Sequence, residues 1–169
     1  FMEIPILETE RLILRPLTIG DAEEVFSWAS DERVTRFMGY PKHENIEVTK
    51  AWLSSLADVP EKSFDWGFVL KENGKLIGSG GVSWNDEYNA WTFGYNISFD
   101  CWGRGYTTEV TKRMIKYAYE NLGSRDFVAY HAIDNPASGR VIEKCGMRFS
   151  HFGEYSKFDG SATFKAKFY

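Results

Sequence analysis

Apolar residues recur along this chain with two periods, and each period predicts one kind of secondary structure. Residues 7–17 alternate apolar and polar side chains, as half-buried strands do. Apolar residues three or four apart, such as Val110, Met114 and Ala118, mark one face of a helix. The predicted strands are 7–17, 63–70, 76–84, 91–99, 126–133, 147–155 and 161–168. The predicted helices are 21–29, 46–56, 104–122 and 136–145, with a short helical piece at 31–37.

Turn residues separate these segments. Gly39 and Pro41 end the short helical piece, and Asn73 followed by Gly74 predicts a hairpin. The sequence contains no linker, repeat or low-complexity tract. Strands interleaved with helices predict a mixed α/β sheet. The length of 169 residues suits a single domain spanning 1–169.

The stretch 100–109 joins the strand expected at 91–99 to the long helix that follows, and it contains Gly103 and Gly105. The first turn of a helix presents free backbone N–H groups and the positive end of the helix dipole. Glycines let an anion come close to that backbone. The stretch therefore predicts a phosphate-binding turn, with an ordinary glycine-rich connection as the alternative.

A second block opens a short helix. Asn135 suits its N-cap, Pro136 its first position and Gly146 its C-terminal cap, and Ser138 falls in the first turn. A third block is the N-terminal stretch 7–17. Together the three blocks resemble the GNAT superfamily of N-acetyltransferases, in the branch named for enzymes that acetylate the N-termini of ribosomal proteins (RimJ/RimL-like). The resemblance covers nearly the whole chain.

The resemblance implies a GNAT fold, which is a mixed, mostly antiparallel sheet splayed in the middle and flanked by helices. It also implies acetyl-CoA as co-substrate, with the pyrophosphate on the turn that begins at Gly103. The expected donors are the backbone N–H groups of Arg104, Gly105, Tyr106, Thr107 and Thr108. The family's usual Gln or Arg at the start of this motif is Asp100 here, and a carboxylate disfavours a nearby pyrophosphate unless it points away.

Three basic side chains are candidates for contact with the cofactor phosphates. Arg104 contributes charge at the turn, or it is a solvated arginine at a helix start. Arg140 and Lys144 share one face of the short helix, where they meet the 3′-phosphate of CoA or form a solvated surface.

The resemblance further implies that the strand at 91–99 and the strand ending near His131 splay apart, so that pantetheine lies between them. Backbone groups of Tyr95, Asn96 and Ile97 would then pair with its amides, as an added strand does. A backbone N–H in this strand would also polarise the thioester carbonyl as an oxyanion donor.

Two residues of the second block receive catalytic roles from the resemblance. Asn135 contacts the pantetheine arm through its NH₂ group, which leaves its side-chain oxygen free to cap the helix. Ser138 protonates the departing CoA thiolate, with an ordinary surface serine as the alternative. Because a free thiol has a pKa of about 8.5, such an acid need contribute little.

The general base is less well marked. Related sequences often carry a carboxylate two residues before Gly94, and this chain has Thr92 there. The remaining candidates are Glu87, His131 and Glu154, among which histidine is the residue type suited to proton transfer near neutral pH. An α-amine, with a pKa of roughly 7.7–8.0, needs less help from a base than a lysine at about 10.4. The missing carboxylate therefore favours an α-amine, another low-pKa amine or deprotonation through water.

Aromatic residues near the N-terminal helices have two interpretations. Trp28, Tyr40 and Trp52 either line an acceptor pocket or pack in the core. Hydrophobic residues make up 43% of the chain and aromatic residues 17%, which is enough for a sizeable core.

Charge and apolar runs exclude several classes of protein. The net charge of -4 argues against a nucleic-acid binder, and no apolar run approaches the ~18 residues of a membrane span. Cys101 and Cys145 form no metal pattern, and we expect no metal. A nucleophilic Cys101 is disfavoured because no His lies nearby in sequence. Free thiols in a reducing cytosol are the expected state, so we expect a cytoplasmic protein.

These observations predict an acetyltransferase in which a primary amine attacks acetyl-CoA directly. Three hypotheses stay open: acetylation of protein N-termini, acetylation of a small-molecule amine, and non-catalytic binding of acyl-CoA. The phosphate-binding turn together with Asn135 and Ser138 favours catalysis, whereas Thr92 and Asp100 keep the binding module in play. Both a monomer and a homodimer are compatible with the sequence.

Overall fold

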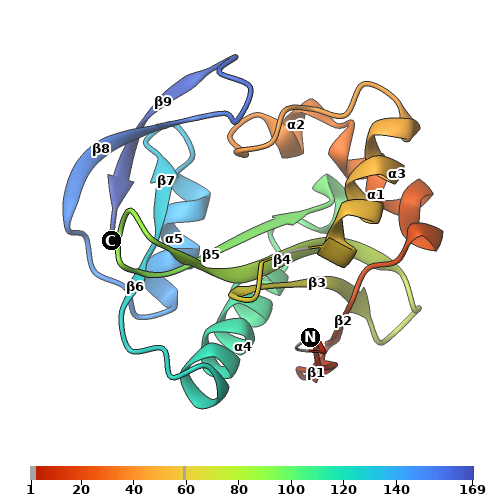
Figure 1. Ribbon diagram of the computed structural model, residues 1–169, viewed down its shortest axis with the longest axis horizontal. Coiled ribbons are helices and arrows are strands. Elements are labelled where there is room, and N and C mark those ends of the chain that lie inside the picture. Colours follow the sequence, from red (N-terminus) through yellow and green to blue (C-terminus); the bar gives the residue numbers. More distant parts are fainter. Residues whose placement is uncertain (1–2, 59) are drawn as a thin grey trace.

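Two sheets form the centre of the protein in the computed structural model, which describes residues 3–58 and 60–169 (Figure 1). The larger sheet has the strand order β1-β2-β3-β4-β5-β6, antiparallel throughout except for the parallel pair β5 and β6. Its strands are β1 (Leu7–Glu8), β2 (Leu12–Arg15), β3 (Ser63–Leu70), β4 (Leu76–Asn85), β5 (Ala90–Ile97) and β6 (Phe127–Val128). The smaller, antiparallel sheet has the order β7-β9-β8. It consists of β7 (Tyr130–Ala132), β9 (Thr163–Phe168) and β8 (His151–Ser156).

Helices cover both faces of the larger sheet (Figure 1). The long helix α4 (Tyr106–Asn121) lies against one face, and α5 (Pro136–Lys144) packs beside it against β7. The opposite side carries α1 (Ala22–Ala29), α2 (Glu32–Thr35) and α3 (Ile46–Ser55). Short 3₁₀ turns are η1 (Ile19–Asp21), η2 (Leu56–Asp58) and η3 (Phe99–Cys101). In the described residues, no helix is both long and apolar enough to cross a membrane.

Side-chain alternation along β3 separates two cores. Phe64, Trp66 and Phe68 are buried on the α4 side, where Met114 and Val110 of that helix meet them. The other face is covered by a second cluster, which includes Val25 and Trp28 of α1 and Leu53 of α3. Burial of these apolar residues stabilises the fold by roughly 1.5–3 kcal/mol for each large side chain.

The chain passes from one sheet to the other across a single peptide bond. Val128 pairs with Thr92 in the larger sheet, whereas Ala129 exchanges hydrogen bonds with Tyr169 at the end of β9. The sequence analysis expected one strand at 126–133, and this prediction is wrong because the segment is divided between two sheets. Beyond Thr92, the outer edge of β5 therefore has no neighbouring strand among the described residues, and this is the expected splay.

Several predicted ends also shift. The strand expected at 91–99 ends at Ile97, because residues 99–101 turn into η3. The helix expected from residue 104 begins at Tyr106. Gly105 has a left-handed φ of 79°, so it lies outside the right-handed helix that follows. The strand expected from residue 147 begins at His151. The single strand expected at 7–17 is also wrong, because a turn closed by the hydrogen bond from Thr9 N–H to the carbonyl of Leu12 divides it into β1 and β2, which pair antiparallel. The remaining predicted helices and strands match the observed elements to within a few residues.

Candidate active site

A cavity of about 330 Å³ lies where β5, the start of α4 and the start of α5 meet. Its lining combines the end of β5, the glycine turn and one face of α5. The residues are Arg33, Val34, Met38, Tyr95, Asn96, Ile97, Cys101, Trp102, Gly103, Gly105, Tyr106, Thr107, Thr108, Asn135, Ala137, Ser138, Arg140, Val141 and Lys144. We call this space the cofactor cavity. All of the predicted cofactor-binding residues except Arg104 line it.

The glycine turn has the geometry of an anion site. Gly103 and Gly105 have φ values of 75° and 79°, which side chains rarely adopt. No hydrogen bond to another described residue uses the backbone N–H of Arg104, Gly105, Tyr106, Thr107 or Thr108. No side chain caps α4. These N–H groups, at the positive end of a helix of 16 residues, therefore fit a pyrophosphate.

Arg11, the residue before β2, anchors this turn. Its Nε donates to Oε1 of Glu109 at 2.8 Å, and its Nη1 donates to the carbonyl of Arg104 at 2.9 Å. Its guanidinium lies 4.4 Å from the ring centre of Tyr106. Burial raises the pKa of the Glu109 carboxyl, but hydrogen bonds from Thr9 and Arg11 lower it by more, so the pKa is lowered overall. The carboxylate therefore stays ionised and holds Arg11 in place.

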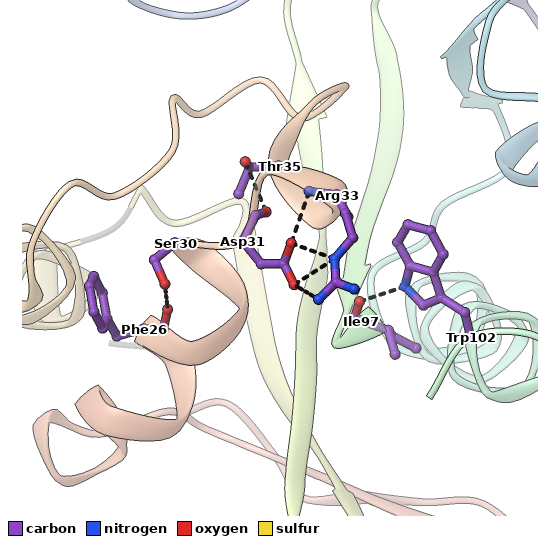
Figure 2. Close-up of polar contacts among 7 residues, drawn as sticks. All are labelled: Phe26, Ser30, Asp31, Arg33, Thr35, Ile97 and Trp102. Carbon is purple, nitrogen blue, oxygen red and sulfur yellow. Dashed lines mark hydrogen bonds and ion pairs between the residues drawn. The ribbon is translucent and has the colours of Figure 1, made fainter. Parts of the chain in front are cut away.

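Three basic residues, Arg33, Arg140 and Lys144, line the cofactor cavity, and Arg33 is paired with an acidic residue. Figure 2 shows Asp31 holding the guanidinium of Arg33, with an Nη2–Oδ2 distance of 2.7 Å, beside Trp102. The indole of Trp102 donates to the carbonyl of Ile97 at 2.7 Å and so occupies part of the end of β5. The hydrogen bond with Asp31 raises the pKa of Arg33, and the charge of the nearby Asp100 adds to the rise. Asp100 is exposed and does not line the cavity.

A second cavity, of about 160 Å³, opens through the splay between β5 and β7. It is lined by Val34, Phe37, Met38, Gly39, Phe93, Gly94, Tyr95, Ala129, Tyr130, His131, Asn135, Ser138, Ile142 and Tyr155. We call it the acceptor cavity. Five residues line both cavities, and the two spaces meet along them: Val34, Met38, Tyr95, Asn135 and Ser138.

The hairpin of β8 and β9 holds one wall of the acceptor cavity. Lys157 Nζ donates to the carbonyls of Thr35, Met38 and Tyr40 at 2.8, 2.9 and 3.2 Å. Tyr155 donates through its hydroxyl to the carbonyl of Phe37 at 2.6 Å. The wall formed by residues 37–39 is therefore fixed by contacts that are far away in sequence.

The predicted catalytic residues Ser138 and Asn135 lie at the junction of the cavities. The hydroxyl oxygen of Ser138 is 2.7 Å from the phenol oxygen of Tyr95. Asn135 occupies the N-cap position of α5, but its side chain makes no capping hydrogen bond. The capping role predicted for its side chain is therefore wrong, and the whole amide group is available to a ligand.

The base candidates differ in position. His131 lines the acceptor cavity, but Nδ1 donates to the carbonyl of Ala132 at 2.7 Å and Nε2 lies 3.1 Å from the hydroxyl of Tyr169. In the neutral ring, its one lone pair is thus already engaged. Glu87 and Glu154 are exposed and line neither cavity. The structure does not bring these three residues together.

The aromatic residues proposed for the acceptor pocket pack in the core instead. Trp28 is 2% exposed, and Tyr40 and Trp52 pack against the same cluster. None of the three lines either cavity. The aromatic lining comes from Phe37, Phe93, Tyr130 and Tyr155, which the sequence analysis did not select. No local signal marks them, because loops and strands distant in sequence bring them together.

Potential metal ligands and the two cysteines were the remaining candidates for chemistry at the site. Within the described ranges, no group of three or more His, Cys, Asp or Glu residues could hold a metal ion. Both cysteines are free thiols, and burial raises the pKa of Cys145 to about 11.

Known proteins are similar to this chain along most of its length. The family model described as "Acetyltransferase (GNAT) domain" matches residues 11–148. The chain is 33% identical over 147 residues to YoaA of Bacillus subtilis (strain 168), described as an uncharacterized N-acetyltransferase. That alignment covers 85% of this chain and 83% of YoaA.

Solved structures share the fold. A GNAT-family acetyltransferase from Bacillus anthracis superposes with a TM-score of 0.84 at 19% identity, covering 98% of this chain and 96% of that one. The microcin C7 self-immunity acetyltransferase MccE, solved in complex with acetyl-CoA and AMP, gives 0.78 at 16% identity, covering 95% and 91%.

Proposed function

Because this chain belongs to the GNAT family of acetyltransferases, we propose that it acetylates an α-amine, in the manner of the branch that acts on protein N-termini. Family membership makes the protein an acetyl-CoA-dependent acetyltransferase rather than a non-catalytic acyl-CoA-binding module. We take residues 1–169 as one acetyltransferase domain. The acceptor and the roles of individual residues are our proposals.

Acetyl-CoA is the co-substrate of this reaction. Its pyrophosphate would accept hydrogen bonds from the free N–H groups that begin at Arg104, while Arg33, Arg140 and Lys144 supply positive charge around the mouth. The pantetheine arm would follow the edge of β5 at Tyr95, Asn96 and Ile97 as an added strand, with the carbonyl of Ile97 already taken by Trp102. This route leads from the glycine turn to the junction of the two cavities.

At the junction, the chain supplies positioning and proton transfer. A backbone N–H of β5 would donate to the thioester oxygen as negative charge develops there. Asn135 would hold the arm through its uncapped amide, and Ser138 would donate a proton to the departing thiolate. Holding amine and thioester side by side removes much of the entropic barrier to attack.

The residues that line the acceptor cavity support the proposed class of acceptor. Its described residues include no Asp, Glu, Lys or Arg, and its walls are largely aromatic or aliphatic. A polyamine carries several positive charges and would find no carboxylate in this lining. An α-amine next to an apolar or aromatic group suits it, whether on a peptide N-terminus or on a small molecule.

Two peptide classes test this proposal. Short peptides with a free N-terminal Phe, Leu, Ser or Lys are compared with N-blocked peptides that carry one internal lysine, and spermidine serves as a polyamine. Release of CoA is followed with a thiol reagent from pH 6 to 9. We expect the highest kcat/KM for free N-termini with an apolar first residue. Faster acetylation of N-blocked lysine or of spermidine at pH 7 would overturn the proposed acceptor.

The free thiols bear on where the protein works. Cys101 and Cys145 are both unpaired, as expected in a reducing compartment, and we propose a cytoplasmic location.

A further inference from the structure

Asp65 is a carboxylate within the central strand β3, between Phe64 and Trp66. Its neighbours point toward α4, so alternation directs Asp65 to the face that α1 and α3 cover in part. A Cβ added to Gly81, its partner on β4, would lie 2.7 Å from Oδ1 of Asp65. The carboxylate therefore lies over the backbone of β4, on the side of the sheet that faces away from α4.

Asp65 is largely buried and unpaired. No described residue makes a hydrogen bond or ion pair with its side chain, yet each oxygen keeps some contact with solvent. Burial raises the pKa of the Asp65 carboxyl to about 6. Burying a carboxylate without a partner costs free energy, and such groups concentrate at functional sites.

Two paired glycines lie between Asp65 and the acceptor cavity. Gly81 pairs with Gly94 on β5, and a Cβ added to Gly94 would meet nothing within 4 Å. Gly94 is exposed and lines the acceptor cavity. Because neighbouring strands lie about 4.8 Å apart, the carboxylate is about one strand spacing from this wall, a distance that one water bridges.

Polar pairs border the route over these two glycines on both sides. Ser83 and Thr92 lie on the same face, with their hydroxyl oxygens 3.3 Å apart. On the other side, Asn96 donates to the hydroxyl of Ser79 at 2.9 Å. The charged residue that β2 contributes to this face is Arg15, whose Nη1 is held by Asp21 at 3.0 Å. Hydroxyls and an amide thus border the route, and the arginine that β2 contributes to this face is already paired.

We propose that Asp65 is the proton acceptor of the reaction, taking a proton through one bridging water from the ammonium form of the amine beside Gly94. The neutral amine then attacks the thioester carbon, so that a C–N bond forms and the C–S bond breaks. The departing thiolate takes a proton from Ser138. The nitrogen loses its second proton, which restores Ser138 through solvent, and Asp65 releases its own proton to solvent. The net reaction releases one proton for each ammonium acetylated.

This role rests on the proposed function of acetylating an amine, and it is consistent with an α-amine as the acceptor. A carboxylate with a pKa of about 6 lies roughly two units below an α-ammonium and more than four below a lysine ammonium. Proton transfer from the α-ammonium is therefore far less unfavourable. Position 92 on β5 has no carboxylate, and Asp65 on β3, two strands away in the same sheet, takes its role.

The test is Asp65→Asn, assayed on whichever acceptor the wild-type protein acetylates fastest. We expect kcat to fall at least ~100-fold, the usual contribution of a general base, with the KM for acetyl-CoA within about twofold. In the wild type, kcat/KM for the amine should fall as the pH drops through about 6, where Asp65 becomes protonated. The variant should lack this fall. Asp65→Glu should recover part of kcat. Glu72→Gln, at an exposed turn carboxylate, is the matched control and should retain full activity.

Two results would overturn the role of Asp65. One is an unchanged kcat and pH profile in Asp65→Asn. The other is a raised KM for the amine with kcat unchanged, which would make Asp65 a binding partner of the ammonium. Because the comparison uses the preferred acceptor of the wild type, it stands even when that acceptor is a lysine. The α-amine proposal is tested separately, by which acceptor the wild-type protein acetylates fastest.

Discussion

The phenol oxygen of Tyr95 lies 2.7 Å from the hydroxyl oxygen of Ser138 and 3.2 Å from the Ser138 carbonyl oxygen. This contact joins β5 to the first turn of α5, where the two cavities meet. Burial raises the pKa of Tyr95 well above its usual range, so the phenol remains a donor at any working pH. When it donates to Ser138 Oγ, the serine hydrogen is free to point into the cavity.

Tyr95→Phe should therefore lower kcat by up to about tenfold, the value of one hydrogen bond, with little change in the KM for acetyl-CoA. Ser138→Ala should lower kcat by more, and the double variant should be no slower than Ser138→Ala. Steady-state kinetics on the three variants gives the coupling between the two residues. Additive losses would mean that Tyr95 acts independently of the serine.

Gly105→Ala should weaken acetyl-CoA binding at least tenfold, because a methyl group at this positive φ disturbs the free N–H groups of the turn. Gly74→Ala is the matched control, since Gly74 has a φ of 71° in the distant β3–β4 hairpin. Both variants should lose similar thermal stability, and calorimetric titration should find weaker binding for Gly105→Ala alone. Equal affinities in the two folded variants would remove the turn from the binding site.

Lys157→Met should raise the KM for the acceptor roughly three- to tenfold, because the carbonyls of Met38 in the cavity wall and of Thr35 and Tyr40 on either side of it lose their shared donor. Acetyl-CoA affinity should change less than about twofold. Lys165→Met, at an exposed position on β9, serves as the control. An acceptor KM that matches the wild type would show that the wall holds without Lys157.

Asp65→Asn should stabilise the protein above pH 6. The folded carboxyl has a pKa of about 6 and the unfolded one about 3.9, so the unfolded state releases its proton first as the pH rises. Wild-type stability therefore falls between about pH 4 and pH 6 relative to the variant. The difference should reach at most about 3 kcal/mol. Urea unfolding of both proteins from pH 4 to 8 measures it, and a difference independent of pH would mean an ordinary carboxyl.

Local pattern predicts most of the elements in this chain. The strand at Ser63–Leu70 and the helix bounded by Pro136 were both visible in it, because alternation and capping are properties of neighbouring residues. The division of 126–133 between two sheets was not, since pairing partners such as Thr92 and Tyr169 lie far away in sequence.

The site shows the same limit. Glycines and helix starts mark the cofactor cavity in the sequence, so its lining was largely predicted. The acceptor cavity depends on Phe37 and Tyr155, which come together only when the hairpin folds over α2. Asp65 gave no signal, because a lone carboxylate in an alternating strand usually faces water.

The passage from Val128 to Ala129 has a mechanical consequence. The two sheets separate between β5 and β7, and the contact of Tyr95 with Ser138 of α5 crosses this seam. A substrate arm that pairs with β5 would fill the gap between the two sheets and stabilise it along its length. Because Lys157 and Tyr155 tie the smaller sheet to residues 35–40, we expect the open edge of β5, rather than that sheet, to become more rigid as the substrate fills the gap.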